Sequence, residues 1–418
     1  MSEGSITKRG ESWMLKYEGG KDATGKRRQL YKTVRGTRKE ADRELRRLLG
    51  QLDEGTHVDP QKMTLAQWIE IWVRDYAAPT VSAKTLERYS ELLRLHVVPY
   101  IGQQAMQKLT SGDLQCLYTK LRTIGRLRSK TKRSAAELAQ PAKVEGLAER
   151  TVLHVHRVLS QALSQAARQR VIVRNPADDA KAPRPEAGQA ADGEEGAGEV
   201  IKALEREPLV ALLRGLRDEW IFPIATTDAG TGMRRGEILA LRRSDIGLDA
   251  RTIRIERAVE ETNKKGRDGK TIRFKAPKNK SSKRTISIDP GLAAFLRGHM
   301  ARQAEEALKL GTHPARDWLL FPKSIAEPTT PIRPRNVSKR FSILAARLGF
   351  PGLRFHDLRH THATLLLTAG VPINAVSQRL GHSTPVITLT VYGHVLPRAD
   401  AQAATVSGTL LEGAITNA

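Results

Sequence analysis

Residues 380–394 read LGHSTPVITLTVYGH, an apolar, β-branched run that carries two histidines and a tyrosine. β-Branched residues favour strands, so residues 386–392 could form a half-buried strand in which Tyr392 is a packing residue. Thr384 followed by Pro385 instead indicates the start of a helix, because threonine caps a first turn and proline fits its first position. This capping signal outweighs the strand propensity and predicts that Tyr392 lies on or at the end of a short helix.

Two segments upstream carry conspicuous basic side chains. Residues 231–246 read TGMRRGEILALRRSDI, and we expect the glycines here to end one helix and Arg234 to begin the next. Residues 277–288 read PKNKSSKRTISI, which predicts a strand preceded by a turn, with Lys278 at the tip of a hairpin. Taken alone, an arginine or a lysine in such a place is usually a solvated surface charge.

A third segment, residues 355–362, reads FHDLRHTH. In a helix, His356 and Arg359 stand three residues apart and face the same way. The three histidines of this segment, His356, His360 and His362, also suggest a metal site. Their spacing fits no familiar zinc motif such as HExxH, and no carboxylate pattern nearby supports one. We therefore expect no metal ion here.

The composition favours a polyanionic partner. The 418-residue chain has 70 Lys+Arg against 45 Asp+Glu, which gives a formal net charge of +25 at pH 7. Such an excess attracts nucleic acid through phosphate contacts and counterion release. A basic protein without a nucleic-acid partner is the alternative. The single cysteine, Cys116, excludes an intrachain disulfide framework and a cysteine-based zinc site.

The apolar stretches of the sequence predict neither an export signal nor a membrane span. The N-terminal sequence MSEGSITKRG has no apolar region typical of an export signal, and no stretch approaches 18 uninterrupted apolar residues. We expect a soluble, intracellular protein that does not bind a membrane.

We expect a multidomain α+β fold that begins with a small basic domain. Residues 1–58 read as three short strands, with turns at Gly19 and Gly20 and near Gly25, and a charged helix from about residue 37 to residue 52. A sheet and helix this basic could lie against DNA. Its aromatic residues either stack there or simply form the core of the domain: Trp13, Tyr17 and Tyr31.

The middle of the chain, residues 62–182, has helical periodicity throughout and predicts an all-α domain. Thr64 and Ser111 precede apolar periodicity and are predicted N-caps, and Asn175 with Pro176 is predicted to stop the last helix. The basic insertion at residues 125–146 is either a DNA-contacting loop or a disordered one.

Residues 183–199 are rich in Pro, Gly, Ala and acidic side chains, which predicts a linker because so little apolar surface can be buried. Residues 200–418 alternate helices with strands, and we expect a mixed, mainly α domain with a small antiparallel sheet.

Separately each basic or histidine-containing motif is weak, but their order resembles one family, the tyrosine recombinases, also called the phage integrase family. TGMRRGE resembles its first arginine box and PKNKSSKR its lysine hairpin. HDLRHTHATLLL resembles its second box, and LGHSTPVITLTVYGH resembles its nucleophile segment. Carried over position by position, the active-site residues of the family are Arg234, Lys278, His356, Arg359, His382 and Tyr392.

The resemblance implies a reaction at one DNA phosphorus atom. Tyr392 would attack and form a 3′-phosphotyrosyl bond, with His356 as the acceptor of its proton. Arg234 and Arg359 would hold the phosphate oxygens. Lys278 would protonate the leaving 5′-oxygen. His382 would donate to a nonbridging oxygen and orient the tyrosine.

Two further expectations follow from this chemistry. The two guanidinium groups do what a metal does in many nucleases, so we expect neither a metal ion nor a nucleotide cofactor. The apolar side chains before Tyr392 would dock its helix and present the phenol to DNA.

The resemblance covers nearly the whole chain. It identifies residues 1–58 as an arm-type DNA-binding domain, residues 62–182 as a core-DNA-binding domain and residues 200–418 as the catalytic domain. The implied function is site-specific integration, with excision as a further outcome, of a phage or mobile element.

The implied partners are double-stranded DNA attachment sites, core and arm, bound by a homotetramer on two sites. Accessory DNA-bending or directionality proteins are further candidates. The implied place is the bacterial cytoplasm, at the nucleoid. Two alternatives remain: a type IB topoisomerase, which would lack an arm-like domain, and a DNA-binding regulator without catalysis, which the six intact side chains disfavour.

Overall fold

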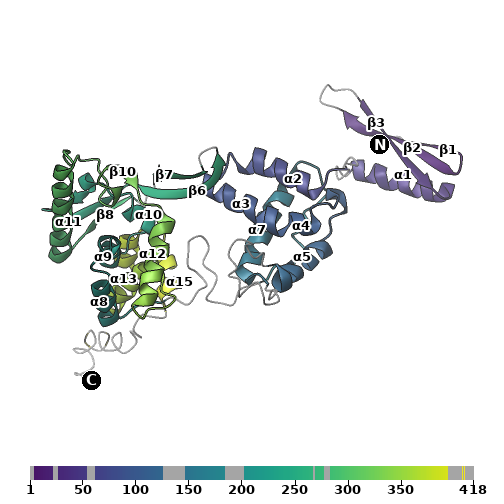
Figure 1. The fold of residues 1–418 in the computed structure, drawn as a ribbon. Helices are drawn as coiled ribbons and strands as arrows, with labels where there is room; N and C mark the ends of the chain where they lie inside the picture. Colours follow the sequence, from purple (N-terminus) through teal and green to yellow (C-terminus); the bar gives the residue numbers. More distant parts are fainter. Residues whose placement is uncertain are drawn as a thin grey trace, which may run out of the picture. The chain divides into compact units, whose positions relative to one another are not determined.

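The computed structural model describes residues 4–21, 27–53, 62–125, 146–183, 202–266, 269–276 and 283–393, together with residues 407 and 409. The chain separates into two compact units, Met1–Arg184 and Pro185–Ala418 (Figure 1). Both contain helices, and small antiparallel sheets occur in each, so the α+β class expected from the sequence is confirmed. No helix within the described ranges is long and apolar enough to cross a membrane.

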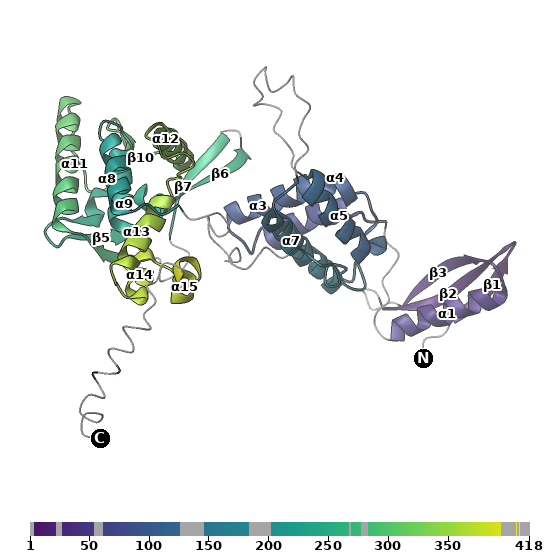
Figure 2. The same ribbon diagram turned by 90° about the horizontal axis from the view of Figure 1, so that it is seen from below.

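The first unit begins with a three-stranded antiparallel sheet and one helix. These elements are β1 (Gly4–Arg9), β2 (Ser12–Lys21), β3 (Arg27–Arg35) and α1 (Arg38–Asp53). The strands pair in the order β1-β2-β3, and α1 lies along the sheet (Figure 2). Leu15 and Tyr17 of β2 pack with Leu45 and Leu48 of α1, and all four are buried. The predicted strands and charged helix are therefore present.

The predicted turn at Gly19 and Gly20 is wrong. Both glycines belong to β2. The register with β3 shifts between Glu18 and Lys21, and β2 pairs with β3 on both sides of this irregularity, so the strand continues through the glycines. The first turn instead lies at Gly10, whose φ of 58° is a left-handed conformation that glycine adopts without strain. The predicted turn near Gly25 lies outside the described residues.

The remaining regular elements that the structure describes in the first unit are helices and helical turns. They are α2 (Leu65–Ile71), the π-helical η1 (Trp72–Ala77), α3 (Ala83–His96), α4 (Val98–Ile101), the 3₁₀ turn η2 (Met106–Lys108), α5 (Ser111–Ile124) and α7 (Glu149–Arg168). One hydrophobic cluster holds them together, and within it the indole N–H of Trp68 donates to the Ala162 carbonyl at 2.8 Å. This cluster is separate from the one between β2 and α1.

Three predicted helix boundaries can be compared with the structure. Thr64 is the N-cap of α2, as predicted. The N-cap of α5 is Thr110 and not Ser111, because Thr110 exchanges hydrogen bonds with Asp113 in a capping box. Helix α7 ends at Arg168, well before Asn175, since Arg170 takes a left-handed φ of 55°. The basic insertion lies outside the described residues except at its two ends.

The second unit combines helices with three small sheets. Its helices and turns are α8 (Arg206–Gly215), α9 (Phe222–Thr231), α10 (Arg235–Ile238), η3 (Arg243–Asp245), α11 (Pro290–Lys309), α12 (Pro334–Arg347), α13 (Asp357–Thr368), α14 (Ile373–Leu380) and α15 (Pro385–Tyr392). Its strands are β4 (Ile246–Gly247), β5 (Thr252–Ile255), β6 (Ala258–Gly266), β7 (Gly269–Lys275), β8 (Arg284–Ser287), β9 (Pro322–Ser324) and β10 (Glu327–Pro331).

The sheets of this unit correct one prediction. The antiparallel orders are β4-β5-β8, β6-β7 and β9-β10, so β7 and β8 belong to different sheets. The two strands that flank Lys278 in the sequence therefore do not pair with each other and form no β7–β8 hairpin. The pairing partner of β8 is β5, because the buried Ile286 lies opposite the buried Ile253. Lys278 itself lies outside the described residues.

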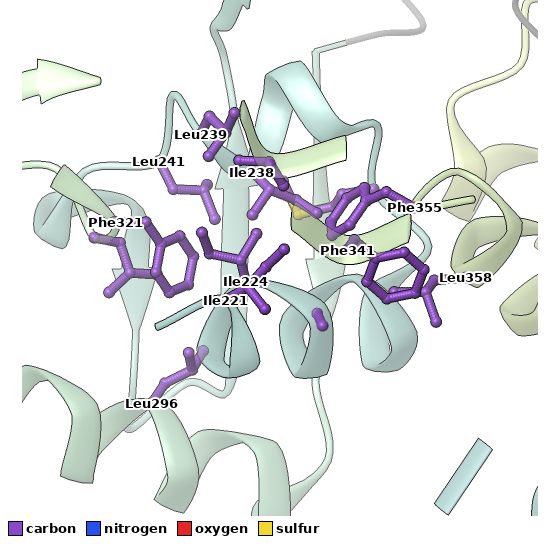
Figure 3. Close-up of a cluster of buried hydrophobic side chains, with 14 of the residues drawn as sticks. Ile221, Ile224, Ile238, Leu239, Leu241, Leu296, Phe321, Phe341, Phe355 and Leu358 are labelled. Carbon is purple, nitrogen blue, oxygen red and sulfur yellow. The ribbon is translucent and has the colours of Figure 1, made fainter. Parts of the chain in front are cut away.

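Two hydrophobic clusters stabilise the second unit. In the larger one, Phe341 and Phe355 meet edge to face with ring centroids 5.4 Å apart, and Leu358 is buried with them (Figure 3). This geometry is one that aromatic pairs prefer. The smaller cluster contains Ala363, Leu367, Val376, Leu380 and Tyr392. It joins α13, α14 and α15, the helices that carry or directly flank four of the six predicted site residues.

Candidate active site

The end of α9 fixes the position of Arg234. Gly232 caps α9 with a φ of 63°, and a Cβ at this position would lie 2.6 Å from the Cδ2 of His362. Arg234 then begins α10, where its backbone N–H donates to Glu237 at 3.0 Å. Its guanidinium donates to the Glu237 carboxylate at 3.2 Å and to the Gly381 carbonyl at 3.1 Å. The predicted position at a helix start is confirmed.

Arg359 on α13 lies beside the same turn. It is 2 % exposed, and its Nη1 donates to the Gly232 carbonyl at 2.6 Å. Its Nη2 is also buried and has no hydrogen-bond partner among the described residues. Burial, and then the positive charge of Arg234, lower the pKa of Arg359 to about 10. Arg359 therefore stays charged at neutral pH and has a donor free for an anion.

His356 is the N-cap residue of α13, one turn before His360. The two imidazole rings meet edge to face with centroids 4.8 Å apart. Burial, and then the charge of Arg359, lower the pKa of His356 well below its ordinary value. The ring is therefore neutral at neutral pH.

His382 follows Gly381, which ends α14 in a left-handed conformation. Its Nδ1 lies 2.7 Å from the Oγ1 of Thr388 on α15. Burial, and then the charges of Arg359 and Arg234, lower the pKa of His382 to about 3. His382 thus contacts α15, the helix of Tyr392, through Thr388. Its role in orienting the tyrosine, which the family resemblance implies, stays a prediction.

Tyr392 is the last residue of α15 and is 1 % exposed, so the predicted helix is confirmed. Its hydroxyl group lies 2.7 Å from the Nδ1 of His360. Burial raises the pKa of Tyr392 to about 12, although the charge of Arg359 opposes this shift. Of the apolar residues expected to dock this helix, Val391 packs against the small hydrophobic cluster, but two others do not dock. Val386 and Leu389 are 64 % and 52 % exposed, because Thr388 and Tyr392 face inward to histidine partners.

One acidic and one basic residue, neither of which was predicted from the sequence as a site residue, complete the site. Glu237 is 4 % exposed, and its carboxylate accepts from Arg234 and from both amino groups of Arg284. Burial alone would raise the pKa of Glu237, but the charges of Arg284 and Arg234 hold it below the ordinary value. Arg284 also donates to the Arg379 carbonyl at 2.8 Å. The pair therefore joins β8, α10 and the end of α14.

His360 was considered in the sequence only as a metal ligand. Its spacing of one helical turn from His356 was the signal for a second role, since residues four apart share a helix face. Among the described residues, no group of three or more His, Cys, Asp or Glu side chains is placed to hold a metal ion.

The structure brings five of the six predicted residues together. They are Arg234, His356, Arg359, His382 and Tyr392, and their links run through Gly232, Gly381, Thr388 and His360. Their order along the chain spans 159 positions, so tertiary packing alone creates the cluster. Lys278, the sixth, falls among the residues that are not described.

Comparison with known proteins decides the family. Residues 214–398 match the phage integrase family, and residues 64–122 match the phage integrase N-terminal SAM-like domain. The chain belongs to the phage integrase family, the tyrosine recombinases.

Relatives in this family match over most of the chain. A tyrosine recombinase, XerC-like, from Caldanaerobacter subterraneus is 28 % identical over 386 residues, which is 91 % of each chain. An integrase from Saccharopolyspora erythraea is 26 % identical over 383 residues, which is 80 % of each. Among solved structures, the Tn1549 transposon integrase in complex with a circular intermediate DNA is 18 % identical. It has a TM-score of 0.61 and covers 84 % of this chain and 99 % of its own, which shows a shared fold.

Proposed function

We propose that this chain is a site-specific DNA recombinase that cleaves and rejoins DNA strands through a covalent bond between Tyr392 and a 3′-phosphate. The observation that carries this proposal is the buried phenol of Tyr392 close to Arg359, whose Nη2 has no partner among the described residues. A phenol beside a charged guanidinium group that has an unused N–H donor suits attack on a phosphodiester. Family membership supports the same reaction.

The two arginines are proposed to hold the phosphate. Arg359 has the free donor, and Arg234 is 23 % exposed at its side chain, so a DNA phosphate can reach it. Removing one such donor typically costs about 3–4 kcal/mol of transition-state stabilisation, or about 10²- to 10³-fold in rate. His382 is neutral and can donate one ring N–H to a nonbridging oxygen while the other nitrogen bonds Thr388.

The remaining proton transfers involve a lysine and a histidine. Lys278 is proposed to protonate the leaving 5′-oxygen, as the family resemblance implies. The resemblance gives the phenol proton to His356, whose ring meets the ring of His360, the residue that hydrogen-bonds the phenol. The free 5′-hydroxyl of a second strand would then reverse the reaction, so no nucleotide is consumed.

The domain division is also proposed. Residues 1–58 would form the arm-type domain, residues 62–182 the core-DNA-binding domain, residues 183–199 the linker, and residues 200–418 the catalytic domain. The separate hydrophobic clusters of β2 with α1, of α2–α7 and of the second unit support this division.

One face of the β1–β3 sheet supports DNA binding by the arm-type domain. Tyr31 is 58 % exposed and lies opposite Lys16 on the face away from α1. Arg9 and Arg35 flank Ser12 on the same face and are exposed. A basic face with an aromatic side chain suits a DNA groove. Deleting residues 1–55 should weaken integration and spare cleavage of core sites. Equal loss of both activities would contradict this division.

The partners are proposed to be two double-stranded attachment sites bound by a homotetramer. Accessory DNA-bending or directionality proteins are further proposed partners, and the reaction would take place on the bacterial nucleoid. Sedimentation of the protein with two-site DNA tests the tetramer, and a complex with one copy on each site would contradict it.

The experiment that tests the reaction is covalent capture. The full chain is incubated with nicked duplexes that carry candidate attachment sites from the DNA flanking its own gene, and a denaturing gel separates protein–DNA adducts. We expect an adduct from the wild-type chain and none from Tyr392→Phe, which keeps the ring and removes the oxygen. An adduct with Tyr392→Phe, or none from the wild type with any site, would refute the proposal.

A further inference from the structure

The Tyr392 hydroxyl group and the imidazole of His360 are in direct contact. Nδ1 of His360 lies 2.7 Å from the phenol oxygen, within the 2.6–3.2 Å range of a proton donor and its acceptor. Tyr392 is 1 % exposed and His360 is 6 % exposed, so water has little access to this hydrogen bond. The two side chains come from α15 and α13, which the small hydrophobic cluster holds together.

The direction of this hydrogen bond depends on which nitrogen of the imidazole carries the proton. Burial lowers the pKa of His360 to about 4, so the ring is neutral at neutral pH and one of its nitrogens carries no proton. Nε2 is buried without a hydrogen-bond partner among the described residues. In the tautomer with the proton on Nε2, the lone pair of Nδ1 accepts the phenol O–H, and the inference below uses this tautomer.

We propose that His360 positions Tyr392 and accepts its proton as the phenol oxygen attacks phosphorus, an inference that rests on the proposed function. The O–H bond of Tyr392 breaks, its proton moves to Nδ1, and the oxygen forms the bond to phosphorus. The bond from phosphorus to the 5′-oxygen breaks, and that oxygen takes a proton from the general acid, proposed as Lys278. In the rejoining step His360 returns its proton to the departing phenolate.

The surrounding charges suit a histidine that becomes charged only during the reaction. The carboxylate of Asp357 raises the pKa of His360, while Arg359 and Arg354 lower it. A DNA phosphate bound at Arg359 would offset part of that positive charge and favour the imidazolium. The neutral ring of His356 meets His360 edge to face, so it supports the ring of His360 without reaching the phenol in a hydrogen bond.

The pH dependence of adduct formation separates a proton acceptor from a residue with only a structural role. His360→Leu removes the acceptor, and His360→Asn keeps a polar group near the position of Nδ1 that cannot take up a proton. Relative to the wild type, both variants should lose about 10²- to 10⁴-fold in adduct-formation rate near neutral pH. The wild-type rate should change little between about pH 7 and pH 9, whereas the rates of both variants should rise about tenfold per pH unit, because hydroxide must then remove the proton.

The matched control is His362→Leu on the same helix. His362 is also buried with a pKa of about 4, but its ring bonds the Ala229 carbonyl and the guanidinium of Arg379, not the phenol. Its replacement should lower the rate of adduct formation by the same factor at every pH, without a rise at high pH. His356→Leu should behave in the same way. If the rise with pH occurs in His356→Leu and not in the His360 variants, the proton acceptor is His356 and the inference is overturned.

A substrate with sulfur in place of the leaving 5′-oxygen gives a second readout, because a thiolate leaves without a proton. This substrate should restore adduct formation by Lys278→Ala and not by His360→Leu. Restoration of both would overturn the inference. Failure of the proposed function has a different result, namely an adduct with Tyr392→Phe or none with the wild type. Loss of the adduct in Tyr392→Phe, together with wild-type rates in His360→Leu, would overturn the inference alone.

Discussion

Replacing Glu237 by glutamine removes the negative charge that Arg234 and Arg284 share. The carboxylate accepts from Arg234 at 3.2 Å and from Arg284 at 3.2 and 2.9 Å, and the Arg284 side chain is 8 % exposed. An amide of the same size would turn one of its own N–H groups toward a guanidinium. Arg234, Arg284 and the nearby Arg359 would then repel one another without a counter-charge.

The expected magnitude follows from the burial of this ion pair. Removing one partner of a buried pair costs about 3–5 kcal/mol, since the other charge stays buried without compensation. At about 1.4 kcal/mol for each factor of ten, local opening of α9 and α10 should become about 10²- to 10⁴-fold more frequent. Adduct formation should fall as well, because Arg234 loses the carboxylate that orients its guanidinium.

Hydrogen–deuterium exchange of the full chain measures this change locally, in peptides that cover residues 222–241. The matched control is Glu219→Gln. Glu219 pairs with Arg340 at 2.7 Å, but the two side chains are 26 % and 38 % exposed, so the expected loss is below about 1 kcal/mol. If exchange in Glu237→Gln accelerates no more than in this control, the charge of Glu237 does not stabilise the site and the reasoning is refuted.

Three further outcomes can be checked by unfolding of the second unit. Gly232→Ala should cost about 1–3 kcal/mol, because of its φ of 63° and the contact of a Cβ with His362, and an unchanged melting temperature would contradict this. Phe341→Ala should cost about 3–5 kcal/mol, since Phe341 is fully buried against Phe355, and a loss below about 1 kcal/mol would count against the packing described. Acidification should destabilise the unit, because the folded pKa of His360 and of His362 is about 4 against an ordinary 6.5. Between about pH 4 and pH 6.5 the folded chain therefore binds fewer protons at these histidines than the unfolded chain does. The free energy of unfolding is at its full value above about pH 6.5 and falls toward pH 4, by about 2 kcal/mol per histidine at pH 5. Equal stability at pH 7 and pH 5 would refute this.

Local features were predictable from the sequence because their causes are local. Thr384 and Pro385 do begin α15, and Thr64 does cap α2, since a cap depends on a few neighbouring residues. Arg234 lies at its predicted helix start for the same reason. The error at Ser111 is of one residue, and the capping box formed by its neighbour Thr110 explains it.

Features that depend on distant parts of the chain were not predictable. Polarity alone places Val386 inside and Thr388 outside, yet the structure does the reverse. The reason is that the partners of Thr388 and Tyr392 are His382 and His360, which other segments supply. Likewise, sequence proximity suggested a hairpin around Lys278, whereas β8 pairs with the distant β5.

The division of the second unit into two hydrophobic clusters has a consequence for shortened forms of the chain. The buried members of the larger cluster all precede Arg359, while Tyr392 belongs to the smaller one. A stop codon just after Gly381 would leave the larger cluster with all of these members and would remove the attacking oxygen. Such a truncated copy would keep the larger hydrophobic core, but it would lack the oxygen that the proposed reaction needs to form its covalent bond.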